Sequence, residues 1–181
     1  MADLTAVTPC DGLLPITRGD LTLTEGTPGW MTLIAVYKRQ KVALSEALRA
    51  AHGLRWPDPG QVSGTDARLI WFGMGQAMLL GPVPADALKP HAALTDQSDG
   101  WALVELRGPG ASDVLARLVP IDLRASVFGE AQTARTMLGH MNVSLTAVQG
   151  GYDILAFRSM AKTLVHDLDT AMSLWIARSQ G

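Results

Sequence analysis

Residues 101–110 read Trp-Ala-Leu-Val-Glu-Leu-Arg-Gly-Pro-Gly, and this stretch decides the fold of the chain. Its first six residues are almost all apolar, which is typical of a buried β-strand. The Gly-Pro-Gly turn leads into a short helical segment that ends before Pro120. Two further strands, residues 141–148 and 152–157, are joined by a Gly-Gly turn suited to a hairpin. Residues 94–157 therefore predict one β-α-β-β unit.

The strand predicted at residues 141–148 alternates apolar and polar side chains. This places Met141, Val143, Leu145 and Ala147 on one face, against the core. We expect the opposite face to be either solvated or shared with another element. A closing helix follows, with an apolar stripe at three- and four-residue spacing.

The first half of the chain repeats this order. A strand at residues 31–37 leads to a helix at residues 40–52 and then to a hairpin at residues 67–80. Gly29-Trp30 and Gly100-Trp101 stand 71 residues apart, each at the head of an apolar strand. We predict an α+β fold of two related β-α-β-β halves, with antiparallel or mixed sheets and helices packed on one face.

Three segments follow from this interpretation. Residues 1–28 form an N-terminal arm rich in Pro and Gly, with one possible short edge strand at residues 21–24. Residues 29–90 form the first half, and residues 91–181 form the second. The arm either wraps its own domain, reaches a neighbour or stays loose.

Composition narrows the function classes. The formal charge is −2, and no long basic run is available to neutralise phosphates, so we expect no nucleic-acid partner. Charged residues make up 18% of the chain, below the ~25% typical of soluble domains. This leaves room for an apolar interface, although ordinary scattered surface apolar residues explain it equally well. With a single cysteine, Cys10, and no leader-like or membrane-spanning run, we expect a cytoplasmic protein.

Groups that carry chemistry are scarce. The four histidines, at positions 52, 91, 140 and 166, show no metal-ligand spacing, and Gly108-Pro109-Gly110 does not continue into a dinucleotide-binding motif. No serine lies in a nucleophile turn, and Cys10 has no local partner. We expect no catalytic residue, no metal and no cofactor in this chain.

Five residues are candidates for a ligand site or an interface. His140 follows a glycine at the mouth of a strand, where it serves either as a structural or interface residue or as a ligand contact. Asp96 and Asp99 indicate a turn ordered by local hydrogen bonds, with a site role as the alternative. Trp101 belongs either to packing or to a stacking platform. Asn142 is the fifth candidate.

Three segments carry a resemblance: TDQSDGW at residues 95–101, GPGASDVLARLVPIDL at residues 108–123 and ARTMLGHM at residues 134–141. Together they resemble the gamma subunit of heterotetrameric sarcosine oxidase and, more distantly, the folate-binding aminomethyltransferase (T-protein) fold. The resemblance implies a non-catalytic subunit bracing larger, flavin-bearing subunits. The assembly would oxidise sarcosine to glycine, with hydrogen peroxide and formaldehyde or methylene-tetrahydrofolate as products. FAD, FMN, NAD and tetrahydrofolate would belong to the complex.

The T-protein resemblance also implies an aspartate on the strand at residues 141–148, where it would contact the pterin and the reacting amine. Here the polar positions are Asn142, Ser144 and Thr146, and neither an amide nor a hydroxyl supplies that charge. The alternative function, an independent folate-binding or aminomethyltransferase-like protein, needs a carboxylate in the cleft between the halves. The nearby carboxylates in the sequence are Asp96, Asp99, Glu105 and Asp122. A third possibility is an interaction module that serves another enzyme.

Overall fold

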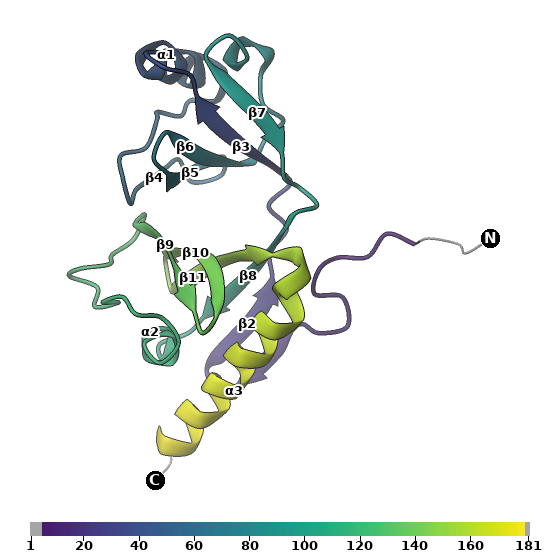
Figure 1. Ribbon diagram of the computed structural model, residues 1–181. Coiled ribbons are helices and arrows are strands. Elements are labelled where there is room, and N and C mark those ends of the chain that lie inside the picture. Colours follow the sequence, from purple (N-terminus) through teal and green to yellow (C-terminus); the bar gives the residue numbers. More distant parts are fainter. Residues whose placement is uncertain (1–4, 180–181) are drawn as a thin grey trace.

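The apolar runs of the sequence become the strands of two sheets in the computed structural model, which describes residues 5–179 (Figure 1). The first sheet has the order β1-β2-β8-β11-β10-β9, with these bounds: β1 Ile16–Arg18, β2 Leu21–Glu25, β8 Trp101–Arg107, β9 Thr133–Leu138, β10 Met141–Val148 and β11 Gly151–Phe157. The second has the order β4-β5-β6-β3-β7, with these bounds: β3 Trp30–Val36, β4 Val62–Ser63, β5 Arg68–Gly73, β6 Gln76–Gly81 and β7 Ala92–Asp96.

Helices cover one face of each sheet. The bounds are α1 Lys41–His52, η1 Asp86–Leu88, α2 Ala111–Leu115, η2 Arg158–Met160 and α3 Ala161–Ser179. Helix α1 lies over the second sheet, and α2 and α3 lie over the first (Figure 1). Within residues 5–179, no helix is long and apolar enough to span a membrane.

The two halves share one topology, as the sequence predicts. The order β4-β5-β6-β3 in the second sheet matches β9-β10-β11-β8 in the first, and α1 and α2 each follow the corresponding strand, β3 or β8. Trp30 and Trp101 begin those two strands. Every pairing between these strands is antiparallel. The α+β fold class of two related halves is confirmed, in its antiparallel form.

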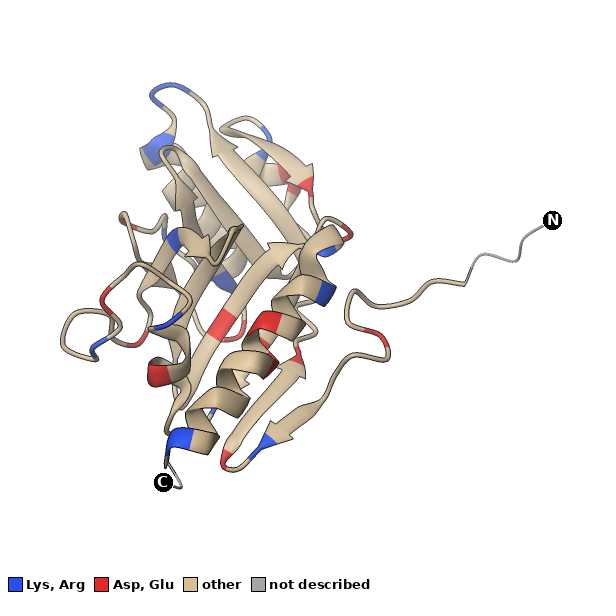
Figure 2. Ribbon diagram, turned by 60° about the horizontal axis from the view of Figure 1, so that its bottom comes forward, with Lys and Arg blue, Asp and Glu red and all other residues tan. Residues whose placement is uncertain are grey.

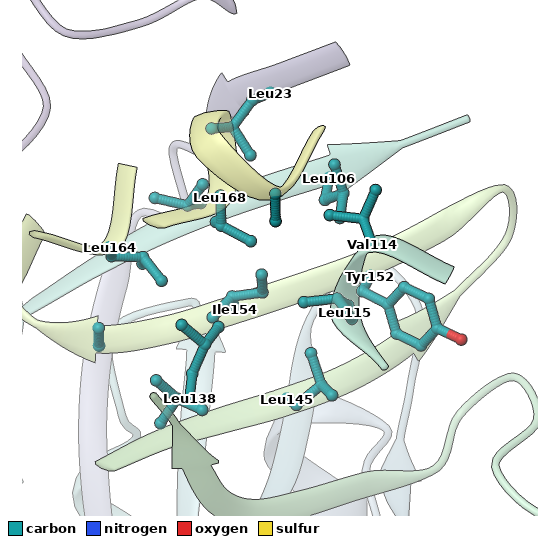
Figure 3. Close-up of a cluster of buried hydrophobic side chains, with 14 of the residues drawn as sticks. Leu23, Leu106, Val114, Leu115, Leu138, Leu145, Tyr152, Ile154, Leu164 and Leu168 are labelled. Carbon is teal, nitrogen blue, oxygen red and sulfur yellow. The ribbon is translucent and has the colours of Figure 1, made fainter. Parts of the chain in front are cut away.

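Burial occurs in three layers. In the first sheet, the alternation in β10 turns Val143 and Leu145 toward α2 and α3, where side chains from several strands and both helices meet (Figure 3). A second cluster lies beneath α1. A third cluster contains Met31 and Met78 from one sheet and Trp101 and Leu155 from the other. The face of β10 expected to be wet or shared is therefore mainly shared, because the two sheets pack against each other.

The N-terminal arm is part of the first sheet. Leu21 and Leu23 of β2 are fully buried, and β2 pairs with β8, while β1 is the edge strand. The strand predicted at residues 21–24 exists, but it lies one strand inside the edge. Of the alternatives for the arm, the structure shows that it packs on its own domain. Residues 1–4 of the expected arm lie outside the described residues.

The passage between the sheets lies later in the chain than the expected boundary at residues 90/91. Strand β7 pairs with β3 and so belongs to the second sheet, which is formed by the first half of the chain. The chain enters the other sheet at Trp101, through a turn at residues 97–100. Strand β7 is short and three of its five residues are exposed, so its sequence carries no signal for which sheet it joins.

Candidate functional site between the two sheets

The predicted turn before Trp101 is held by Asp96. Its Oδ1 accepts hydrogen bonds from the backbone N–H and the hydroxyl of Ser98, at 2.9 Å and 2.7 Å. These bonds lower the pKa of Asp96, because they favour the charged form. Ser98 Oγ in turn accepts a bond from the backbone N–H of Met31 at 3.1 Å, while Asp99 is exposed. The interpretation of a turn ordered by local hydrogen bonds is confirmed for Asp96.

Trp101 lies in the layer between the sheets and is only 4% exposed. Its ring meets Phe72 edge-on, with the centroids 5.1 Å apart, and it lies 4.4 Å from the ring of Phe157. Its indole N–H donates to Gln97 Oε1 at 3.2 Å, which ties the ring to the turn. Of the two interpretations of Trp101, packing or a stacking platform, this geometry supports packing.

His140 and Asn142 are both exposed on the β9–β10 hairpin, His140 in its turn and Asn142 on β10 opposite Met137. The five candidate residues therefore do not form one site: Asp96 and Asp99 share the turn before β8, whereas His140 and Asn142 share a hairpin. No group of histidines, cysteines and carboxylates within residues 5–179 is arranged to hold a metal ion.

The carboxylate between the halves is Asp153 on β11, which the sequence reasoning missed. It is 4% exposed, and guanidinium groups take both of its oxygens. Arg107 Nη2 lies 2.5 Å from Oδ1, and Arg68 Nη1 lies 2.5 Å from Oδ2. Because Arg68 belongs to the second sheet, this cluster of Arg68, Arg107 and Asp153, the Asp153 cluster, joins the two halves.

Sequence reasoning missed Asp153 because its partners are distant in the chain, at separations of 46 and 85 residues. A charged residue in a strand is ordinarily taken as solvated, since carboxylates are seldom buried unless paired. The one available signal was an aspartate inside the apolar run 152–157, because aspartate is depleted in strands.

The Asp153 cluster lines a cavity of about 510 Å³ at the edge of the intersheet layer. Glu105, Glu130 and Thr146 also line this cavity. Glu105 is thus the only one of the four expected carboxylates that lies there, and Asp122 is instead exposed and paired with Arg124. A carboxylate with both oxygens held by guanidinium groups is a structural bridge and not a free base.

Another charged side chain between the sheets, Arg135 on β9, has a different environment. Its guanidinium lies 4.1 Å from the ring centroid of Phe72 and 5.3 Å from that of Trp101. Burial lowers its pKa, because desolvation disfavours the charged form. Ser144 stands directly opposite on β10, and its buried Oγ has no hydrogen-bond partner among residues 5–179.

Comparison with known proteins identifies relatives of this fold. No family model matches the chain. In a solved structure of heterotetrameric sarcosine oxidase from Corynebacterium sp. U-96, in complex with pyrrole 2-carboxylate, one chain superposes with a TM-score of 0.82 at 24% identity. The match covers 94% of this chain and 96% of that one. The fold is therefore that of a component chain of a heterotetrameric sarcosine oxidase.

The chain is also similar to a curated protein from Corynebacterium sp. (strain P-1), named sarcosine oxidase subunit gamma. It is 34% identical over 124 residues, which are 63% of this chain. The chain spans 60% of the length of this curated relative. The resemblance to the gamma subunit, inferred above from three segments, is confirmed.

Proposed function

We propose that this chain is a non-catalytic subunit of a hetero-oligomeric oxidase that demethylates sarcosine. The observation that carries the proposal is the fold correspondence over 94% of the chain with a component of such an assembly, together with the likeness to a protein named as its gamma subunit. In this proposal the larger subunits bear FAD, FMN and NAD, and the products are glycine with hydrogen peroxide and formaldehyde, or methylene-tetrahydrofolate when tetrahydrofolate is present.

The internal chemistry of the fold supports a bracing role. The buried carboxylate that joins the halves is paired with two arginines, one from each sheet, so it links the sheets and is not free to act as a base. The intersheet layer is otherwise filled by packed apolar and aromatic side chains. A rigid double sheet of this kind presents fixed surfaces to neighbours.

The test is purification of the chain from its own host with a mild affinity tag. We expect larger, yellow subunits to co-purify in fixed stoichiometry, and the isolated complex to produce hydrogen peroxide from sarcosine. The chain expressed alone should be colourless and inactive. A flavin spectrum with turnover in the isolated chain would refute the proposal.

A second candidate, independent folate binding, has one observation in its favour: Asp153 supplies a carboxylate beside a cavity between the halves. Both of its oxygens are already bonded, which argues against a free contact to an amine. Titrating tetrahydrofolate into the isolated chain separates the two candidates. Micromolar binding that is lost in Asp153→Asn would favour the second one.

A further inference from the structure

One surface of the first sheet joins an unpaired charge to exposed apolar groups. We define the Arg135 face as Arg135 and Met137 of β9, Asn142 of β10 and Phe157 of β11. Directly opposite residues in antiparallel strands share a face, which places Met137 beside Asn142, and Phe157 beside Trp101. Met137 is 37% exposed and Phe157 46% exposed.

Arg135 is the charged centre of this face, and its charge is uncompensated. Its guanidinium is held against Phe72 and Trp101, and within residues 5–179 it makes no ion pair and no hydrogen bond. Contact with aromatic faces offsets only part of the hydration free energy that a guanidinium loses when it is half-buried. Arg68 and Arg107, by contrast, both form ion pairs with one buried carboxylate.

A row of aromatic rings extends from the guanidinium of Arg135 to the protein surface. Phe72, Trp101 and Phe157 form a continuous contact, with centroid separations of 5.1 Å and 4.4 Å, and only Phe157 at its end is strongly exposed. Two of the residues singled out by sequence, Asn142 and Trp101, belong to this arrangement. Charged residues are sparse over the fold as a whole (Figure 2), so an unpaired arginine within an apolar surround is distinctive.

We propose that the Arg135 face docks a larger subunit of the assembly, and that this partner presents an acidic side chain to Arg135 and apolar side chains to Met137 and Phe157. This inference rests on the proposed function. A carboxylate supplies the charge and the hydrogen-bond acceptors that the guanidinium lacks. A small free anion would leave Met137 and Phe157 in water, whereas a protein surface would cover both.

The test uses tagged full-length chain, expressed in its own host, and measures the amount of flavin-bearing subunit that it retains. Arg135→Met keeps the bulk of the stem but removes the charge, and we expect about 30-fold weaker retention. Met137→Asp should weaken it at least about 10-fold, because it places a like charge against the acidic partner. Arg135→Lys keeps the charge and should retain part of the affinity.

Val42→Asp is the matched control, since Val42 is 72% exposed on α1, over the other sheet. It should retain the larger subunits as the wild type does. Wild-type binding should weaken with added salt, and binding by Arg135→Met should depend less on salt. The thermal transition of Arg135→Met shows whether this variant folds. If it does not fold, the exposed substitution Met137→Asp and the salt dependence of the wild type test whether the Arg135 face binds the larger subunit.

The outcomes separate the two proposals. Variants that retain flavin-bearing subunits as well as the wild type would overturn the docking face and leave the proposed function standing. A wild-type chain that retains no such subunit would overturn the proposed function and this inference with it. Loss in Met137→Asp together with an unaffected Val42→Asp would support the docking face.

Discussion

Asp153 illustrates how one residue couples the two halves of the fold. It lies on β11 of the first sheet, and its carboxylate bonds Arg107 of that sheet and Arg68 of the other. Arg107 also donates to the backbone carbonyl of Tyr152 at 2.7 Å. Removing the carboxylate would leave two guanidinium groups facing each other in a partly dry layer.

We therefore expect Asp153→Ala to lower the free energy of unfolding by about 2–4 kcal/mol, near the lower end of the range for breaking buried pairs because both arginines keep some solvent contact. Urea titration measures this loss. Asp122→Ala is the control, because it removes the exposed pair with Arg124 and should leave the midpoint nearly unchanged. Equal midpoints for Asp153→Ala and the wild type would contradict the bridging role.

Cys10 gives the fold a pH dependence on the alkaline side. Burial, followed by the charge of Glu25 and a hydrogen bond to it, raises the pKa of the thiol to about 11. The folded state then holds a proton that the unfolded state, with a pKa of about 8.5, releases. This contribution is fully present below about pH 8.5 and is lost as pH rises toward 11.

The expected result is a steeper fall of stability between pH 8.5 and pH 10.5 in the wild type than in Cys10→Ala, the fall being roughly 1–2 kcal/mol larger. Urea titrations of both proteins at the two pH values measure the difference. Parallel pH profiles would show that the thiol is not held protonated by the fold.

At the scale of elements, the β10–β11 hairpin depends on two adjacent glycines for different reasons. Gly150 has φ of 74°, with open space where a Cβ would stand, whereas a Cβ on Gly151 would lie 2.0 Å from the backbone oxygen of Leu106. The first glycine serves the turn, and the second allows β11 to approach β8.

Replacing each by alanine should separate these roles. Gly150→Ala should cost about 1–2 kcal/mol through the left-handed backbone. Gly151→Ala should cost roughly 3 kcal/mol or more, because two paired backbones must move apart. Chemical denaturation compares the two variants, and equal losses would show that the strand spacing is not limiting.

The arm is also an element of the core. Leu23 of β2 is fully buried among side chains of the first sheet and its helices (Figure 3). Leu23→Ala should lower stability by about 2–5 kcal/mol, the range for truncating a buried leucine. Val7→Ala, at an exposed position of the same arm, should change little. Similar, small effects for both would mean that the arm is loosely attached.

At the scale of the whole molecule, the two sheets share one buried layer and one ionic bridge. Met78 of β6 is fully buried in that layer, with Trp101 and Leu155 contributed by the other sheet. Such sharing favours unfolding of both halves in one cooperative step.

We expect far-ultraviolet circular dichroism and tryptophan fluorescence to report one coincident urea transition. In Met78→Ala both signals should shift together, by about 2–5 kcal/mol of stability. Two separated transitions in the wild type would show that the halves fold independently.

The sequence by itself determined the local order of the fold: apolar runs and glycine turns marked both β-α-β-β halves, and the paired Gly-Trp positions marked their repeat. It also marked the turn at Asp96, because that turn is built from neighbouring residues. Only the tertiary structure decided that the arm pairs inside the first sheet, that β7 joins the second, and that Asp153 and Arg135 meet such different surroundings. The physical reason is that periodicity reports which face of an element is apolar, whereas the identity of the surface that covers it depends on contacts between residues far apart in the chain.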